Sequence, residues 1–187
     1  ILKLSSNCDA MVVGCGVGME DETASALNDL IRKVQKPLVI DADALKILDL
    51  ELIKESDMEI VLTPHSAEFK SLFGDTIPES NVDKISVVKK ASKSSGATVL
   101  LKGALDIIAL DEEIKLNSTG NPGMTVGGTG DCLAGLIGGL ISQGYDSFES
   151  AILGAYINGK AGDMAAHDLG NNFTATDLIK YIPKAFF

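Results

Sequence analysis

Residues 117–135 read Asn-Ser-Thr-Gly-Asn-Pro-Gly-Met-Thr-Val-Gly-Gly-Thr-Gly-Asp-Cys-Leu-Ala-Gly and lead directly into an apolar run. Nine of the chain's 19 glycines lie between Gly120 and Gly144, so the stretch is a glycine-rich loop in front of a predicted helix. Glycine has no Cβ, and its backbone amides can therefore approach a bulky anion closely. At a helix N-terminus, unpaired N–H groups and the positive end of the helix dipole favour an anion. The stretch predicts an anion site.

Asp131 stands at the start of this predicted helix and brings a carboxylate to the anion site. A loop that only holds phosphate gains nothing from a negative charge there. A base that deprotonates a hydroxyl attacking a phosphoryl group would stand at this position. The alternative is a flexible loop with a capping aspartate. The specific pattern Gly-Gly-Thr-Gly-Asp at 127–131 favours phosphoryl transfer.

Composition limits the classes of protein to which the chain can belong. Its 187 residues fit one domain, 1–187, and 45% hydrophobic with 22% charged residues is typical of a globular protein. The 26 acidic against 16 basic side chains, net −10, argue against nucleic-acid and membrane partners. An acidic protein can still bind a nucleotide, because backbone amides and Mg²⁺ neutralise phosphate locally.

The cysteines and the hydropathy of the chain indicate the cellular compartment in which the protein is expected. Cys8, Cys15 and Cys132 lack metal-ligand spacing and are expected to be small buried residues in a reducing environment. No apolar stretch reaches the roughly 20 residues of a membrane span, and the first residues do not resemble a signal peptide. We therefore expect a cytoplasmic protein.

Apolar, β-branched segments alternate with segments of helical spacing along the first hundred residues. Strands are predicted at 10–13, 37–41, 59–62 and 97–102, and helices at 21–35, 42–54, 67–73 and 82–94. Such alternation predicts an α/β fold with a mostly parallel sheet and helices on both faces. Segments 106–110 and 113–116 predict a hairpin, so the far edge is antiparallel. Helices at 129–143, 148–166 and 176–180 complete the prediction.

In an open α/β sheet, ligands bind beyond the carboxyl ends of the strands. Polar or glycine-rich segments follow the four predicted parallel strands, in order 14–18, 41–43, 63–65 and 102–103. The 127–131 loop can complete the same edge. Their convergence predicts a single ligand site there.

Each of these segments also has a purely structural interpretation. Gly14, Gly16 and Gly18 form either a structural turn or a ligand contact, since a lone glycine triplet is a weak signal. Asp41 and Asp43 are more simply a strand end and a helix cap, with Asp43 the expected N-cap.

His65 and Lys102 carry the same ambiguity. His65 follows Pro64 in a loop and is predicted to be functional, although with Glu68 it can also form an ordinary helix start. Lys102 closes an apolar strand, where it either snorkels to solvent or contacts phosphate together with the Gly103 amide.

Taken together, these residues resemble the ribokinase-like superfamily and, within it, the ADP/ATP-dependent NAD(P)H-hydrate dehydratases. The resemblance covers nearly the whole chain. It rests on the turn 14–18, Asp-Ala-Asp-Ala-Leu at 41–45, Thr-Pro-His at 63–65, Lys-Gly-Ala at 102–104, and Gly-Asn-Pro-Gly-Met at 120–124 running into 127–131. The last segment and Thr-Pro-His are the most specific, because Gly-x-Gly-Asp alone is shared across the superfamily.

The resemblance implies a three-layer ribokinase-like sandwich and a metabolite-repair lyase. Such an enzyme dehydrates hydrated NADH or NADPH by phosphorylating the ring hydroxyl and eliminating phosphate. ADP or ATP is then the co-substrate and Mg²⁺ the cofactor. Asp131 would be the catalytic base, and Gly128, Thr129 and Gly130 would form the anion hole.

The resemblance also assigns binding residues. Hydrated dinucleotide would contact Asp131 and the residues Gly14, Gly16, Gly18 and His65. Adenine nucleotide would contact Lys102, Gly103, Ala104, Leu105, Asp106, Asn117 and Gly130. Glu68 would stand near Mg²⁺, through a water molecule. A homo-oligomer is expected.

The chain departs from the family pattern at three points. Cys15 stands where the family usually has proline, and Ser66-Ala67 replaces a Pro-Gly pair. The family domain also begins with further β-α units before the point matching Ile1, so the resemblance implies an N-terminally truncated, partial domain. A small-molecule kinase of the same superfamily and a catalytically silent nucleotide-binding subunit are the alternative functions. The sequence does not decide whether ADP or ATP is the co-substrate, or whether an epimerase domain is fused upstream in a longer gene product.

Overall fold

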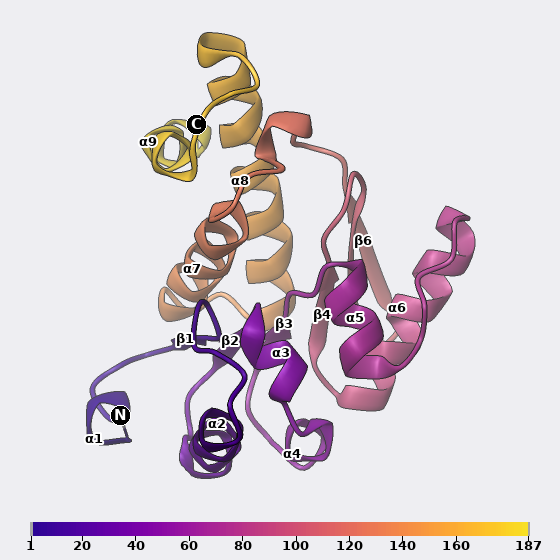
Figure 1. Ribbon diagram of the computed structural model, residues 1–187, viewed down its shortest axis with the longest axis vertical. Coiled ribbons are helices and arrows are strands. Elements are labelled where there is room, and N and C mark those ends of the chain that lie inside the picture. Colours follow the sequence, from indigo (N-terminus) through magenta and orange to yellow (C-terminus); the bar gives the residue numbers. More distant parts are fainter. Residues whose placement is uncertain (1, 187) are drawn as a thin grey trace.

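The computed structural model describes residues 2–186, so Ile1 and Phe187, the ends of the predicted 1–187 domain, lie outside the described residues. Six strands form one sheet in chain order (Figure 1). They are β1 (Met11–Val13), β2 (Leu38–Ile40), β3 (Ile60–Leu62), β4 (Thr98–Leu101), β5 (Asp106–Leu110) and β6 (Glu113–Asn117). The first four are parallel, and β5 pairs antiparallel with both neighbours. The mostly parallel sheet with an antiparallel edge is thus confirmed.

Helices cover both faces of the sheet. They are α1 (Leu2–Ser5), α2 (Asp21–Lys33), α3 (Asp43–Ile47), α4 (Leu50–Lys54), α5 (Ser66–Phe73), α6 (Asn81–Ser95), α7 (Thr129–Ser142), α8 (Ser147–Leu169) and α9 (Ala175–Ala185), with a 3₁₀ turn η1 (Pro122–Met124). Helices α2 to α6 pack on one face, while α7 and α8 pack on the other. Helix α9 packs against α8 beyond the sheet (Figure 1).

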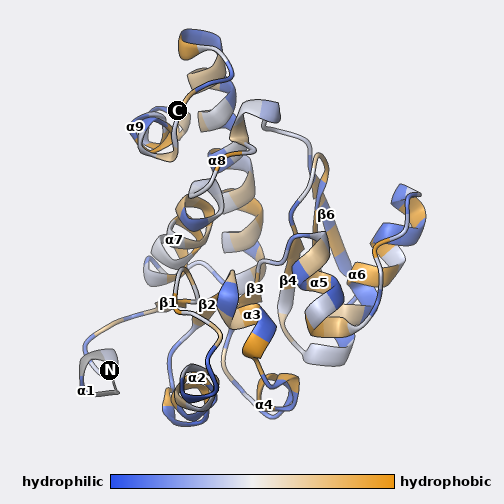
Figure 2. Cartoon of the chain, viewed as in Figure 1, coloured by the Kyte–Doolittle hydropathy of each residue, from blue (hydrophilic) through white to orange (hydrophobic). Residues whose placement is uncertain are grey.

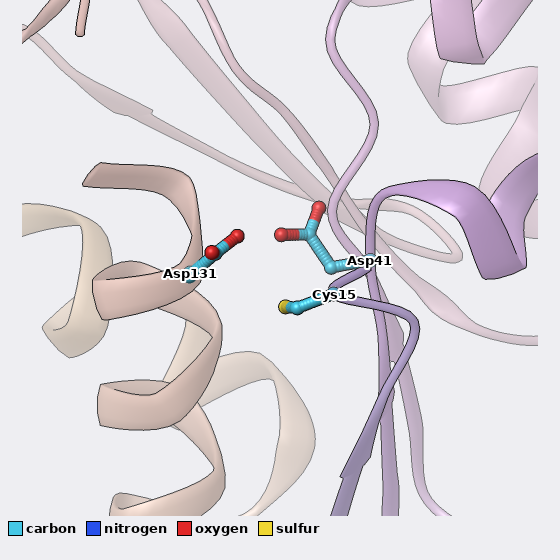
Figure 3. A group of neighbouring side chains, drawn as sticks. All are labelled: Cys15, Asp41 and Asp131. Carbon is cyan, nitrogen blue, oxygen red and sulfur yellow. The ribbon is translucent and has the colours of Figure 1, made fainter. Parts of the chain in front are cut away.

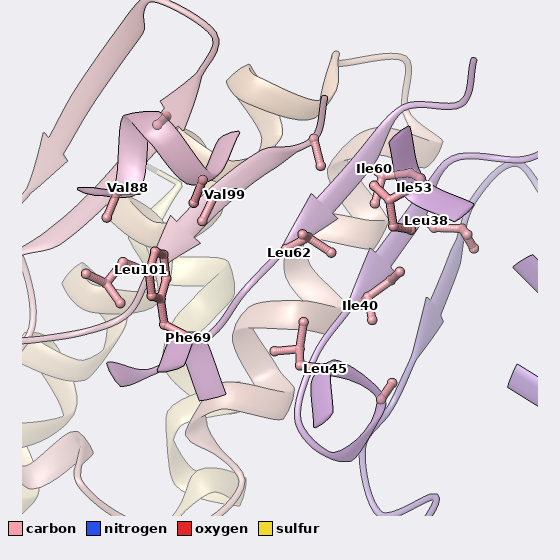
Figure 4. Packing of buried hydrophobic residues seen from close by; sticks show 14 of the residues in the cluster. Leu38, Ile40, Leu45, Ile53, Ile60, Leu62, Phe69, Val88, Val99 and Leu101 are labelled. Atoms are coloured by element: carbon pink, nitrogen blue, oxygen red, sulfur yellow. The ribbon is translucent and has the colours of Figure 1, made fainter. Parts of the chain in front are cut away.

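Alternation along the strands explains the two cores. In β2, Leu38 and Ile40 face the α2–α6 layer, whereas Val39 between them faces α7 and α8. Figure 4 shows the first of these clusters, in which strand side chains meet Phe69 of α5 and Leu45 of α3. Because successive strand residues point to opposite faces, a strand covered on both sides must be apolar throughout. That is why these strands are continuous hydrophobic runs.

The outer helices are amphipathic. Helices α3 to α6 carry both hydrophilic and hydrophobic segments (Figure 2), so one side of each packs on the sheet while the other meets water. No helix formed by residues 2–186 is both long enough and apolar enough to cross a membrane.

Three helical features differ from expectation. The predicted helix 42–54 is two helices, because Leu48 is extended (ψ 132°) and the Asp49 side chain accepts the Glu51 N–H to start α4. Helix α9 continues past Lys180 through Pro183, since packing on α8 offsets the missing N–H of proline. The short elements α1 and η1 carry too little periodicity to be predicted.

Candidate active site

The carboxyl ends of β1 to β4 lie at one edge of the sheet, where the amino end of α7 also arrives. Chain segments far apart in sequence therefore meet there. Figure 3 shows Cys15 after β1, Asp41 after β2 and Asp131 in the first turn of α7 with their side chains pointing toward one another. Their potential ligand atoms all lie within 4.8 Å of one another. The expected convergence of strand ends holds for these residues.

The amino end of α7 is open. Its N-cap residue is Gly128, at φ 94°, a left-handed conformation that glycine adopts without strain. No side chain among the described residues caps this helix. The Thr129 hydroxyl instead donates back to the carbonyls of Met124 (2.8 Å) and Val126 (3.0 Å), which anchors the loop. The Thr129 N–H makes only a long contact with the Val126 carbonyl, at 3.5 Å, and an uncapped helix end of this kind can bind an anion.

Lys102 lies between two deeply buried carboxylates. Its Nζ is 2.7 Å from Asp41 Oδ1 and 3.8 Å from Glu68 Oε2. The side chains of Asp41 and Glu68 are only 2% and 6% exposed, and that of Lys102 is 20% exposed. Burial of so many charges is tolerated when they are paired. Lys102 therefore does not snorkel freely to solvent.

The same lysine also lies next to α7. A Cβ on Gly130 would be 3.5 Å from Lys102 Nζ and 3.8 Å from Asp41 Oδ2. The lack of a side chain at Gly130 thus leaves the ion pair in direct reach of the helix end. The predicted anion hole and the predicted lysine share one site.

His65 starts α5 as its N-cap. Its Nδ1 accepts the N–H groups of Ala67 (3.1 Å) and Glu68 (3.3 Å), and Glu68 Oε2 accepts the His65 N–H (2.9 Å). Because Nδ1 accepts, the ring proton of neutral His65 is on Nε2, which lies 3.2 Å from Glu68 Oε1. The side chain of His65 is 52% exposed. A structural role as a helix start and an exposed ring that can contact a ligand coexist in this residue.

Cys15 faces the two acidic side chains. Burial, followed by a hydrogen bond to Asp131 and the charges of Asp131 and Asp41, raises the pKa of the Cys15 thiol to about 11, against the opposing effect of Lys102. The thiol is therefore protonated at neutral pH. The expectation that the cysteines are buried is wrong: Cys8 and Cys15 are exposed, and Cys132 is partly exposed.

Two backbone features fix Asp41 at the edge. Gly14, at φ 126°, packs so closely on Asp41 that a Cβ there would collide with the Asp41 carbonyl oxygen. Ala42 adopts φ 52°, which costs a non-glycine residue on the order of 1–3 kcal/mol. Strain of this kind is often found where a side chain is held for function. Gly14 thus has a structural role beside any ligand contact.

The other predicted substrate glycines lie in the same turn. Gly16 has open space around it, and the Gly18 N–H donates to Asp43 Oδ2 (3.3 Å). Asp43 is the first residue of α3 rather than its N-cap, a position taken by Ala42. The predicted cap is wrong because the Asp43 side chain bonds Gly18 and Lys46 instead.

The predicted nucleotide segment is braced by its own side chains. Asp106 accepts the Gly103 N–H and the Asn117 amide, both at 2.9 Å, and Asn117 Oδ1 accepts the Thr119 hydroxyl (2.8 Å). Burial raises the pKa of Asp106, against those two hydrogen bonds. Ala104 is exposed and Leu105 partly so, in the turn between β4 and β5. Asp106 and Asn117 shape this turn, while Gly103 and Ala104 are open to a ligand.

A further side chain holds the 120–124 segment. Asp163 of α8 accepts the Gly120 N–H (3.1 Å) and the Asn121 side-chain amide (3.0 Å). The Asn121 side chain also accepts the Gly123 N–H at the start of η1. The loop that leads to α7 is therefore fixed to the core helix.

The acidic residues fit a divalent cation such as Mg²⁺. Mg²⁺ prefers carboxylate oxygens and water, and is usually held by one or two carboxylates. Asp41 and Asp131 offer oxygens within 4.8 Å of each other. Both oxygens of Glu68 are occupied by His65, and the residue is 5% exposed, so direct ligation would break its cap. Glu68 suits a metal only through water.

The sequence placed segments 14–18 and 41–43 at the predicted ligand edge without singling out Cys15 or Asp41, and it did not indicate Asp163 at all. A strand-ending aspartate has the local pattern of a helix cap, and its partner Lys102 is 61 residues away. Asp163 lies in the middle of a long helix with no motif around it. Cys15 was indicated only by its place in the 14–18 segment and by its departure from the family pattern.

Comparisons with known proteins show the family of the chain. The family model described as NAD(P)H-hydrate dehydratase matches residues 1–184. A bifunctional NAD(P)H-hydrate repair enzyme Nnr of Methanothermobacter thermautotrophicus is 45% identical over 98% of the chain. The chain spans 36% of that relative's length.

Solved structures show the same fold. The ADP/ATP-dependent NAD(P)H-hydrate dehydratase of Bacillus subtilis, co-crystallised with ATP/Mg²⁺ and soaked with CoA, is 23% identical with a TM-score of 0.82, covering 99% of this chain and 70% of that one. A ribokinase-like superfamily protein of Enterococcus faecalis is 25% identical with a TM-score of 0.74, covering 98% and 66%. The predicted ribokinase-like fold is confirmed.

Proposed function

The chain belongs to the NAD(P)H-hydrate dehydratase family, and from this membership we propose that it catalyses the nucleotide-dependent dehydration of hydrated NADH and NADPH. The observation that carries the proposal is Asp131 beside the uncapped amino end of α7, with Lys102 in reach. A carboxylate base, free amides and an ammonium group together suit the transfer of a phosphoryl group to a hydroxyl.

The proposed reaction has two stages. Asp131 accepts the proton of the hydrate's ring hydroxyl while that oxygen bonds to the terminal phosphorus of ATP or ADP, and the bond to the leaving nucleotide breaks. The ring nitrogen's electron pair then expels inorganic phosphate, and loss of the neighbouring ring proton restores the dihydronicotinamide. Phosphate leaves far more readily than hydroxide, which explains the use of a nucleotide. A positioned base contributes about 10²- to 10⁴-fold in rate.

Negative charge on the transferring group is met by this chain's own groups. The amides of Gly128, Thr129 and Gly130 form the proposed anion hole, supported by the absence of a side-chain cap among the described residues at α7. Mg²⁺, when bound, supplies further neutralisation of phosphate charge. Asp41 and Asp131 would hold it, with Glu68 acting through water.

The remaining contacts follow the position of each segment. The half-exposed ring of His65 and the turn carrying Gly16 and Gly18 are proposed to contact the hydrated dinucleotide. Lys102 and the Gly103–Asp106 turn, braced by Asn117, are proposed to bind the adenine nucleotide. A homo-oligomer is supported by three exposed apolar side chains, those of Val12 in β1 and of Val17 and Met19 in the turn after it. A cytoplasmic location stays a prediction.

The test is a recovery assay. Purified chain is mixed with hydrated NADH, Mg²⁺ and either ATP or ADP, and the near-ultraviolet absorbance of the dihydronicotinamide is followed together with released phosphate. We expect both to rise together, one phosphate for each NADH restored, and only with nucleotide present. Nucleotide consumption that yields a stable phosphorylated product would contradict the proposal in favour of a kinase. Nucleotide binding without turnover would contradict it in favour of a silent subunit.

A further inference from the structure

Lys102 is engaged in a way that phosphate binding alone does not require. Its ammonium is 2.7 Å from Asp41 Oδ1, and Asp41 is among the most deeply buried charged residues, at 1% exposure. A lysine kept only for phosphate would extend into the site without such a partner. The pair instead ties the end of β4 to the end of β2.

Charge among the side chains of the site does not balance. Asp41, Glu68 and Asp131 carry three carboxylates, and Lys102 supplies one ammonium. His65 accepts two backbone N–H groups at Nδ1 and so adds no positive charge in this hydrogen-bonded form. The site therefore favours a second cation.

The second cation has a defined place. A carboxylate oxygen of Asp41 lies within 4.8 Å of a carboxylate oxygen of Asp131, and the two groups face each other (Figure 3). A cation between them would share Asp41 with Lys102. Two cations on one buried carboxylate repel each other strongly, because water screens them poorly there.

Lys102 has a second partner within a short movement. Its side chain is a flexible four-carbon stem, and its Nζ lies 3.5 Å from the point that a Cβ of Gly130 would occupy. The uncapped amino end of α7, where the proposed function places the phosphate, lies at this same position. Rotation of the stem can therefore carry the ammonium from Asp41 to the phosphate.

We propose that Lys102 and a divalent cation are alternative partners of Asp41: the cation binds between Asp41 and Asp131, and Lys102 turns to the phosphate at α7. Asp41 is then a positioning residue that keeps the Lys102 ammonium paired, rather than turned to the phosphate, until the cation binds. The inference rests on the proposed function, since cation and phosphate are those of the adenine nucleotide. By linkage, each of the two ligands strengthens the binding of the other.

Manganese binding tests the competition. Mn²⁺ is titrated into wild-type protein and into Lys102→Met, and free Mn²⁺ is measured by electron paramagnetic resonance. We expect Lys102→Met to bind Mn²⁺ about 10-fold more tightly, because Asp41 has lost its competing ammonium. The control is Lys90→Met, which removes a surface lysine paired with Asp75 at 3.0 Å and should leave Mn²⁺ affinity unchanged. Unchanged affinity in a folded Lys102→Met protein, checked by circular dichroism and melting, overturns the proposal.

Lysine labelling of the wild-type protein tests whether Lys102 moves away from Asp41 when the cation binds. It also tests the proposal if Lys102→Met does not fold. Brief reductive methylation is quantified at each lysine by mass spectrometry. We expect Lys102 to react slowly alone, faster with Mg²⁺, and slowly again with Mg²⁺ and ADP, while Lys90 stays constant. If the methylation rate of Lys102 is the same with and without Mg²⁺, the proposal is overturned. Neither experiment uses hydrated NADH, so failure of the dehydratase proposal would be seen separately.

Discussion

The amino ends of α5 and α7 lie at the same edge of the sheet, yet one is closed and the other open. At α5, His65 and Glu68 satisfy each other's backbone N–H groups in a capping box. At α7, Gly128 offers no side chain, and no side chain among the described residues caps the first turn. The same free N–H groups can thus stabilise the fold or bind a ligand: α5 has the first arrangement, and the uncapped α7 leaves room for the second.

An open end is not enough to define a site. Helices α2 and α6 also begin without a side-chain hydrogen bond at the cap, among the helices that the structure describes. What distinguishes α7 is the set of charges beside it, the Asp41–Lys102 pair and Asp131. The comparison teaches that function depends on what the sheet brings to the helix end.

The largest effect is expected from the base at the open end. Asp131→Asn should lower kcat by about 10²- to 10⁴-fold in the recovery assay, because the hydroxyl proton has no acceptor. Melting temperature should change little, since Asp131 is exposed. The matched variant is Asp177→Asn, which weakens the capping box of α9 and should lower stability without slowing turnover. Full activity in Asp131→Asn would refute the assignment of the base.

The second-largest effect is expected when a methyl group is added at Gly130, in the first turn of α7. Gly130→Ala should weaken ADP binding by about 10-fold, because its Cβ projects toward Lys102 Nζ and Asp41 Oδ2. Gly139→Ala, in the same helix with nothing within 4 Å of its Cβ, is the control. Gly139→Ala should stabilise the protein by about 0.5–1 kcal/mol and leave binding intact. Calorimetric titration and urea unfolding measure the two effects; equal ADP affinity in both variants would show that α7 does not hold the nucleotide.

Substitutions of His65, which caps the closed end of α5, should mainly lower the free energy of unfolding. His65→Ala should cost about 1 kcal/mol in unfolding free energy, because two N–H groups lose their acceptor. His65→Asn keeps a good N-cap but lacks the imidazole. If the ring contacts substrate, His65→Asn should recover stability while KM for the hydrate stays raised. Recovery of both would leave His65 with a structural role alone.

The smallest effect concerns the Cys15 thiol, which faces Asp131 at the open end. With a pKa near 11, Cys15 should be alkylated slowly by iodoacetamide at neutral pH and progressively faster as pH rises toward 11. Removing the Asp131 charge lowers that pKa, so Asp131→Asn should raise the rate at a given pH. Desolvation remains as the largest cause, and the change should be modest. Cys8, followed in the same samples, should be alkylated at the same rate in wild-type protein and in Asp131→Asn at a given pH. If the Cys15 rate is also the same in the two proteins, the contact with Asp131 is contradicted.

Local patterns predicted the fold well. The short run 59–62, apolar after Glu59, predicted a strand buried on both faces, and the structure has β3 at Ile60–Leu62. The break between α3 and α4 was not predictable from periodicity, because apolar spacing continues across Leu48. The turn depends on the Asp49 side chain and on the Asn28 side chain of α2, which accepts the Asp49 N–H.

The site was predicted unevenly. The loop that carries Asp131 has a dense local pattern, so its proposed role as base could be inferred directly. Asp41 could not be separated from a helix cap, since its burial and its pairing with Lys102 arise only when β2 and β4 join one sheet. Cys15 was expected to be buried because cysteine usually is, yet its turn lies on the surface at β1.

The sequence by itself determined the strand and helix types, the parallel sheet, the glycine loop and the acidic residue at its end. Each follows from neighbouring residues, through side-chain periodicity or the freedom of glycine. Only the tertiary structure decided which carboxylate Lys102 meets, that Cys15 faces Asp131, and where Asp163 fixes the loop. Those contacts join residues far apart in the chain, and their energies depend on burial and distance, which no local pattern contains.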